Sequence, residues 1–142
     1  MMLVDTYVAP SVIEGVGVFA ARTIAAGTLI WRLDTTFDRL VPRSSLRDAP
    51  EYLRLYLERY TYPMPDDPET LVLEFDNGRF MNHDGENPNT DLSGMTEGFA
   101  RRNIAVGEEL TCNYNEFDPD FQLLPSFVQQ PRKNGRRSHV RF

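Results

Sequence analysis

The eleven residues FMNHDGENPNT, from Phe80 to Thr90, concentrate side chains that can bind a ligand. Three Asn, one of the chain's two His residues and two acidic residues fall within this one stretch. A calcium loop is not expected, because Pro88 stands fifth from Asp84, where a ligand is needed, and no Glu closes the loop. Two interpretations remain: Asn side chains that bond nearby backbone in Asx turns, or a loop that holds a ligand.

The single cysteine, Cys112, limits the metal chemistry. One cysteine forms no intramolecular disulfide and no cysteine-rich zinc cluster. His83 has no nearby second histidine, because the other one is His139, close to the C-terminus. We therefore expect no metal site.

Two further stretches carry chemical signals, GVGVFA from Gly15 and GEELTCNY from Gly107. The Gly-x-Gly pair is not a dinucleotide-binding fingerprint, since the third glycine and the following helix are absent. Each stretch alone is weak evidence, because such glycines often mark only a turn.

An internal repeat indicates how these stretches are positioned. Phe19 and Phe99 each open the pattern F-A-x-R-x-I-A-x-G at identical spacing. Alternating apolar residues before and after a glycine predict a strand, a tight turn and a second strand. We expect Gly27 and Gly107 to adopt positive φ in the two turns.

The middle of the chain predicts one helix and one strand. Leu53, Tyr56, Leu57 and Tyr60 have helical spacing in a segment that follows Pro50. The proline-rich segment YPMPDDPE then ends the helix. TLVLEF, at 70–75, predicts a strand with one face formed by Leu71, Leu73 and Phe75.

Composition favours one folded domain with an acidic surface. The chain has 142 residues and is 41% hydrophobic. Residues 1–131 carry 10 basic and 21 acidic residues, a net charge of −11, and the remaining five basic residues lie in the last eleven positions. Such a body repels nucleic acid and attracts basic partners. No membrane-spanning run or secretory signal is visible, so a cytoplasmic location is expected.

Taken together, the three stretches resemble the SET domain, the lysine methyltransferase family. The opening motif matches Gly15, Gly17, Val18, Phe19 and Ala20. The central Arg-Phe-x-Asn-His motif with its Pro-Asn end matches Arg79, Phe80, Asn82, His83, Pro88 and Asn89, with one extra spacer residue. The last motif matches Ile104, Gly107, Glu108, Glu109, Leu110, Thr111 and Tyr114.

The resemblance implies a fold, a cofactor and a set of site residues. It implies a mostly β fold of the β-clip type, with short strands in several small sheets, one inserted helix and a C-terminal pseudoknot. It implies S-adenosylmethionine as the methyl donor and Tyr114 as the catalytic residue. Glu108 and Glu109 are expected to hold the turn and the knot. The implied cofactor-binding residues are Gly15, Val16, Gly17, Arg79, Phe80, Asn82, His83, Tyr114 and Phe117.

In this resemblance, a side chain at Gly17 would collide with the cofactor, and Phe117 would cover the adenine. Two positions that usually carry aromatic side chains differ here and are expected in the substrate channel, Leu33 and Cys112. Trp31 is expected in the core. The family's cysteine-rich zinc segment is missing from this sequence.

The expected organisation is a SET domain over 1–117 with a helical insert at about 44–62, a C-terminal lid over 118–131 and a basic, disordered tail over 132–142. The expected function is methyl transfer to the ε-amine of a lysine in a basic protein or peptide. The alternative is a catalytically weak module that binds basic peptides. We expect no direct binding of nucleic acid by the acidic body and no membrane as partner, while contact of the basic tail with nucleic acid and a homodimer remain open.

Overall fold

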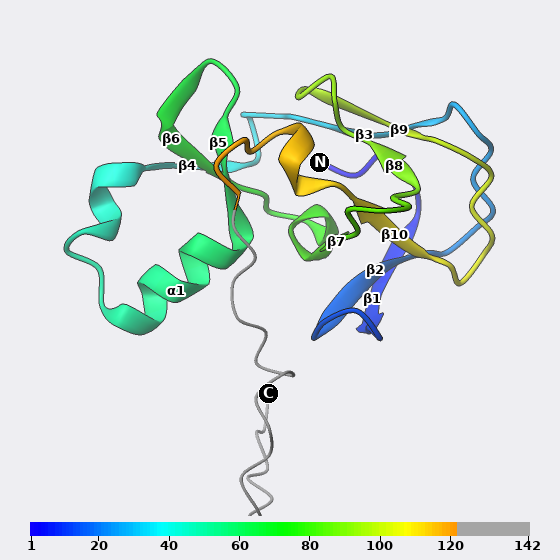
Figure 1. Cartoon of the computed structure of the whole chain (residues 1–142), viewed down its shortest axis with the longest axis horizontal. Coiled ribbons are helices and arrows are strands. Elements are labelled where there is room, and N and C mark those ends of the chain that lie inside the picture. The colour runs from blue at the N-terminus through cyan, green and yellow to red at the C-terminus, as the bar shows by residue number, and fades with distance from the viewer. Residues whose placement is uncertain (122–142) are drawn as a thin grey trace, which may run out of the picture.

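The structure is a computed structural model that describes residues 1–121 (Figure 1). Within this range the chain forms ten short strands in three small sheets, one α-helix and three 3₁₀ turns. This confirms the mostly β SET-type architecture expected from the sequence. None of the helices in residues 1–121 is long and apolar enough to cross a membrane. The expected tail lies outside the described residues, as does the lid beyond Phe121.

The first sheet joins the two ends of the described chain. Its strand order is β1 (Thr6–Pro10), β2 (Val16–Ala20), β10 (Glu109–Cys112) and β7 (Asn82–His83). β10 is antiparallel to β2 and parallel to β7, so the late strand lies between two earlier ones. Asn89, only 2% exposed, accepts a bond from the Thr111 N–H and donates one to the Glu109 carbonyl. The late strand is thus held on both sides, as a pseudoknot requires.

The second sheet and its turns come from the internal repeat. Its strand order is β3 (Leu29–Arg32), β9 (Glu97–Ala100) and β8 (Thr90–Asp91). Gly27 and Gly107 both have a φ of 78°, which confirms the predicted turns. The Gly27 N–H bonds the Ala100 carbonyl at 2.8 Å, and the Gly107 N–H bonds the Ala20 carbonyl at 2.8 Å.

The two copies of the repeat also pair with each other. Ile24 and Ile104 form an isolated antiparallel bridge, with reciprocal N–H to carbonyl bonds of 2.9 Å. Ile104 is fully buried and Ile24 is 5% exposed. Both belong to the main apolar cluster, together with Val18, Ile30 and Leu110, so the repeat forms much of the core.

The third sheet and the helix lie together on one side of Figure 1. They span 39–73, a wider segment than the helical insert expected at about 44–62, and this segment is called the insert below. The strand order is β4 (Arg39–Pro42), β6 (Asp67–Leu73) and β5 (Thr61–Met64). A 3₁₀ turn (Arg43–Leu46) precedes α1 (Glu51–Tyr60), which begins directly after Pro50 as expected. Glu51 in its first turn and Arg59 in its last complement the helix dipole.

Two details of the insert differ from the sequence-based prediction. The proline-rich segment after the helix does not simply end it but forms β5 and the start of β6. β6 ends at Leu73, and its buried residues are the adjacent Leu71 and Val72 rather than an alternating set. Phe75, predicted on the same face as Leu71, is 54% exposed and packs against Phe37.

Candidate active site

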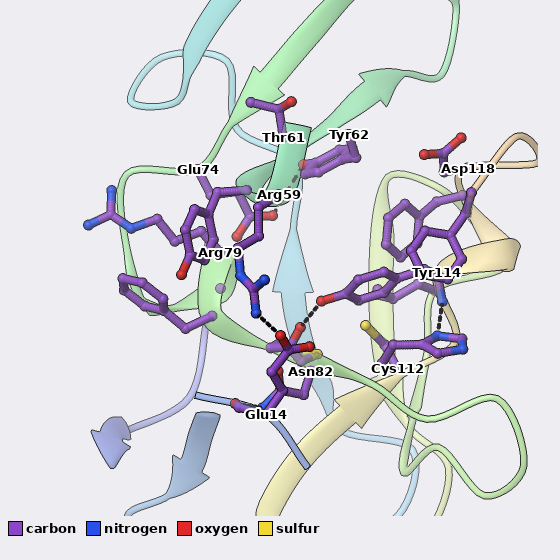
Figure 2. Close-up of a pocket in the computed structure, with 18 of the residues that line it drawn as sticks. Glu14, Arg59, Thr61, Tyr62, Glu74, Arg79, Asn82, Cys112, Tyr114 and Asp118 are labelled. Carbon is purple, nitrogen blue, oxygen red and sulfur yellow. Dashed lines mark hydrogen bonds and ion pairs between the residues drawn. The ribbon is translucent and has the colours of Figure 1, made fainter. Parts of the chain in front are cut away.

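A cavity of about 450 Å³ lies where the glycine loop, the insert and the central loop meet (Figure 2). Its walls come from residues 13–16, the end of α1 with β5, residues 78–83 and residues 112–121. The volume falls within the range of ordinary small-molecule sites. Four segments that are distant in sequence therefore meet at one cavity.

The glycine loop forms one wall. Gly15 has a φ of +50°, a left-handed conformation that favours glycine, and it lines the cavity with Val16. Gly17 does not line the cavity. A Cβ at Gly17 would lie 2.0 Å from the Glu109 Oε1 and 3.2 Å from the Asn82 Nδ2. The structure therefore gives a different reason for Gly17 than the expected collision with a cofactor: it leaves room for a carboxylate.

Asn82 links three parts of this wall. Its Nδ2 lies 3.2 Å from the Glu14 carbonyl, 3.0 Å from the Val16 carbonyl and 2.8 Å from the Glu109 Oε1. The Glu109 carboxylate also accepts a hydrogen bond from the Ser11 hydroxyl. Asn82 and Glu109 thus hold the glycine loop against the late strand β10.

Glu108 closes the second turn of the repeat. Its Oε2 accepts the Ala105 N–H at 2.9 Å, and its carboxylate pairs with Arg102 at 2.6 Å. The Arg102 bond and then the Ala105 N–H lower the pKa of Glu108. Glu108 and Glu109 hold the turn and the strand, as the sequence predicted.

Tyr114 and His83 are fixed to each other. The Tyr114 N–H donates to the His83 Nδ1 at 3.1 Å, and the two rings lie 5.2 Å apart. A ring nitrogen that accepts from an N–H carries no proton, so the proton of a neutral His83 is on Nε2. The Phe121 ring lies 5.0 Å from both rings.

The Tyr114 hydroxyl points into the cavity wall and donates to the Met81 carbonyl at 2.5 Å (Figure 2). Burial is the main reason that the pKa of Tyr114 is raised above its usual value. The phenol is therefore protonated at neutral pH and acts as a hydrogen-bond donor.

The sequence of residues 15–115 matches the family model of the SET domain. The chain belongs to the SET-domain family. No curated protein matches it significantly.

Solved structures resemble the fold of this SET domain at low sequence identity. A humanized mutant of the Chaetomium thermophilum Polycomb Repressive Complex 2, bound to an inhibitor, matches with a TM-score of 0.58 and 20% identity. The match covers 82% of this chain and 16% of that one. An active polycomb repressive complex 2 in its basal state matches with a TM-score of 0.56 and 20% identity, over 78% of this chain and 15% of that one. This SET domain therefore spans about a sixth of those chains.

Nine of the eleven residues expected in the cofactor or substrate site line the cavity. Phe117 lines it too, but its ring packs 5.4 Å from Tyr62 and 5.6 Å from Tyr114 rather than against His83. Besides Tyr114, the ring beside His83 is that of Phe121, which sequence reasoning did not select. The available signal was an aromatic residue a few positions after the last motif. The selected residues in the wall are Gly15, Val16, Arg79, Phe80, Asn82, His83, Cys112, Tyr114 and Phe117.

The two residues expected in the substrate channel occupy different places in the structure. Cys112, 2% exposed, lines the cavity, and burial is the first cause that raises the pKa of its thiol. Leu33 packs against the apolar core and is not among the lining residues. Trp31 belongs to the core, as expected, and also forms part of the cavity wall.

Glu74 is a buried acidic wall residue that the sequence analysis did not select. It follows β6 directly, and its Oε1 accepts the Trp31 Nε1–H at 2.7 Å and the Tyr62 hydroxyl at 3.2 Å. It was missed because an alternating strand pattern assigns it to the face opposite Leu73 and Phe75. Within residues 1–121 no group of three or more His, Cys, Asp or Glu side chains is placed to hold a metal ion.

Proposed function

We propose that this SET domain is an S-adenosylmethionine-dependent protein-lysine methyltransferase. The observation that carries the proposal is one cavity that joins the glycine loop, the Asn82–His83 segment and the Tyr114 hydroxyl. A module that only binds peptides needs no buried tyrosine hydroxyl beside a cavity of this size. The coarser assignment, a methyltransferase-type SET fold, rests on the family match.

The residues of the cavity fit the methyl donor. S-adenosylmethionine supplies a sulfonium methyl group and carries an adenine, an ammonium and a carboxylate. The Arg79 Nε is buried and has no hydrogen-bond partner within the described residues, which leaves a donor for an anionic group. We assign Gly15, Val16, Asn82 and His83 to holding this molecule, with Phe121 as a further aromatic surface.

Tyr114 has a defined task in this reaction. A free lysine side chain has a pKa of about 10.4, so nearly all of it is a non-nucleophilic ammonium at pH 7. Burial among Trp31, Tyr62 and Phe117 favours the neutral amine. The Tyr114 hydroxyl donates its one proton to the Met81 carbonyl, so its oxygen accepts a hydrogen bond from the amine N–H and orients the amine. No covalent intermediate forms.

The substrate is expected to be basic. Residues 1–131 carry a net charge of −11, which attracts cationic segments to the body. The acidic side chains of Glu14, Asp118 and Asp120 also line the cavity. A lysine within a basic segment is therefore the substrate that matches the charge of the protein.

The proposal is tested by incubating the purified protein with isotopically labelled S-adenosylmethionine and a proteome, followed by mapping of the modified residues. We expect label on lysine ε-amines and a loss of label in Tyr114→Phe. Cofactor binding without transfer to any protein, together with tight binding of basic peptides, would identify a binding module instead.

A further inference from the structure

The carboxylate of Glu74 is buried and has an oxygen available to bind a cation. Glu74 is 5% exposed and lines the cavity. Within residues 1–121 no basic side chain forms an ion pair with its carboxylate. Trp31 and Tyr62 both bond Oε1. Oε2 is buried and receives no hydrogen bond from any described residue. A carboxylate that only organised Trp31 and Tyr62 would leave half of its bonding capacity unused.

The backbone beside Glu74 preserves this arrangement. A Cβ at Gly78 would lie 1.8 Å from the Glu74 Oε2, so any larger residue at this position would displace that oxygen. Gly78 lines the same cavity. Oε2 therefore lies against the stretch of wall that leads from Gly78 to Met81, whose carbonyl receives the Tyr114 hydroxyl.

The walls around Glu74 are aromatic. Trp31 and Tyr62 pack edge to face with ring centres 6.3 Å apart, and Phe117 lies 5.4 Å from Tyr62 and 5.6 Å from Tyr114. Aromatic faces attract cations, and a buried carboxylate supplies the matching charge. A chain of ring contacts thus connects Glu74 with the proposed catalytic Tyr114.

The charges that face Glu74 are known from the structure. Its pKa is raised to about 7, mainly by burial and also by the carboxylates of Asp76 and Asp38. The N-terminal ammonium of Met1 and the Trp31 bond act in the opposite direction. Glu74 can therefore exchange a proton near neutral pH.

We propose that Glu74 is the counter-ion of the substrate lysine in this cavity: its carboxylate binds the ε-ammonium group and takes its proton before methyl transfer. This inference rests on the proposed function. The proton passes from Nζ to the carboxylate and leaves a neutral amine and a neutral acid. The freed lone pair on Nζ forms the new bond to carbon as the bond from carbon to sulfur breaks with its electrons on sulfur. Glu74 returns its proton to solvent when the methylated, again cationic, lysine leaves.

Low polarity explains why the proton moves in this direction. Burial raises the pKa of a carboxyl group and lowers that of an amine, so a buried pair favours its neutral form over its ionic form. A carboxylate with an ordinary pKa in water would instead keep the lysine protonated.

The test compares binding rather than turnover. The probes are a short arginine-flanked lysine peptide and the same peptide with uncharged norleucine in place of lysine, titrated calorimetrically. We expect the wild type to prefer the lysine peptide at least tenfold and Glu74→Gln to lose that preference, since Gln keeps an acceptor for Trp31 and Tyr62 but no charge. Glu69→Gln, the same change at an exposed position of β6, keeps it.

The variant Tyr62→Phe distinguishes two roles of Glu74, a counter-ion of the lysine and a carboxylate that only supports the structure. This variant removes one hydrogen bond to Oε1 and leaves the charge, so it keeps the lysine preference. If Tyr62→Phe and Glu74→Gln lose the preference equally, Glu74 is structural and the inference is wrong. A wild type that binds both peptides alike, or neither, also overturns it.

A pH series tests the inference on the wild type itself, so its main readout does not depend on whether a variant folds. The preference for lysine over norleucine is expected to fall as the pH drops through about 7, because the carboxyl then carries its own proton. His83 also lines the cavity, so a preference that stays flat with pH in Glu74→Gln assigns the effect to Glu74. A wild-type preference independent of pH between 5 and 9 contradicts the inference. Because none of these readouts uses methyl transfer, they fail independently of the labelling experiment.

Discussion

The hydroxyl of Tyr114 donates a hydrogen bond to the main-chain carbonyl of Met81 across 2.5 Å. This bond connects the second residue after β10 to the residue before β7. It fixes the phenol at the wall of the cavity, with its proton retained because burial raises its pKa. The consequence is a polar group of defined direction in a largely aromatic environment.

Tyr114→Phe is expected to lower the rate of methyl transfer at least a hundredfold while cofactor affinity changes only a few fold. The variant keeps the ring contacts with His83 and Phe121 and loses one hydrogen bond, at a cost of about 1 kcal/mol in stability. Single-turnover kinetics and calorimetry measure the two effects. Tyr7→Phe, at an exposed tyrosine on β1, is the matched control. Turnover at the wild-type rate in Tyr114→Phe would remove Tyr114 from the catalytic role.

Asn82→Ala is expected to weaken cofactor binding about tenfold or more and to destabilise the fold. The substitution removes the amide that holds the Glu14 and Val16 carbonyls and the Glu109 carboxylate. A lost hydrogen bond to a charged group costs about 1.5–3 kcal/mol. Asn87→Ala, at an exposed position of the same loop, should leave both quantities unchanged. Equal affinities of wild type and Asn82→Ala in calorimetry would contradict the assignment.

Glu74 is expected to make the stability of the wild type depend on pH. Its folded pKa of about 7 lies above the ordinary value of 4.5, so between these values the folded state binds more protons than the unfolded state. Stability therefore falls as the pH rises from about 4.5 to about 7, by up to roughly 3 kcal/mol from this group.

Glu74→Gln removes that dependence, and denaturant unfolding at a series of pH values measures it. The variant should be as stable as the wild type near pH 4.5 and more stable above pH 7. Identical pH profiles for the two proteins would show that Glu74 titrates normally.

Cys112 is expected to permit the addition of more than one methyl group. It is buried in the cavity wall, and its thiol is a weak hydrogen-bond donor that holds water poorly. Mass spectrometry of a defined lysine peptide under excess cofactor should show di- or trimethylation by the wild type. Cys112→Tyr fills the space and should stop at one methyl group, whereas Cys112→Ala should not. A wild type that stops at one, unchanged in Cys112→Tyr, would show that Cys112 does not set the product.

Salt is expected to weaken methylation of basic substrates. The Debye length shrinks from about 10 Å at 0.1 M ionic strength to about 3 Å at 1 M, which screens the acidic body from its substrate. The value of kcat/KM for an arginine-flanked lysine peptide should fall severalfold across this range, mainly through KM. Preferential methylation of an acidic peptide, without salt dependence, would contradict the charge argument.

The parts of the fold that could be predicted depend on local backbone chemistry. Gly27 and Gly107 were predictable because a strand, a positive-φ turn and a second strand need only nearby residues. α1 was predictable from its helical spacing and from Pro50 at its start. β5 was not, because Pro63 within it argues locally against a strand, and its pairing with β6 appears only in the folded chain.

The site residues also divide into those that the sequence could locate and those that depend on contacts between distant segments. Asn82, His83 and Tyr114 stand in motifs whose order identifies the family, so the sequence locates them without a structure. Glu74 was not predictable, because its burial arises from Trp31 and Tyr62, which approach it from two other strands. At Gly17 the sequence predicted a collision between a side chain and the cofactor, whereas the group that the folded chain brings near is the Glu109 carboxylate.

The bridge between Ile24 and Ile104 has a consequence for how the chain folds. The backbone groups of Ile24 and Gly27 form these hydrogen bonds only with the other copy of the repeat, eighty positions away. The same holds for Ile104 and Gly107, so neither copy completes its bonds alone. Closing such a loop costs entropy before any contact offsets it, so folding is expected to be slow, on the order of milliseconds to seconds, and without a stable half. Because β10 follows the turn of the later copy and leads to Tyr114, a nascent chain released before that strand is made is expected to acquire neither a complete core nor the cavity.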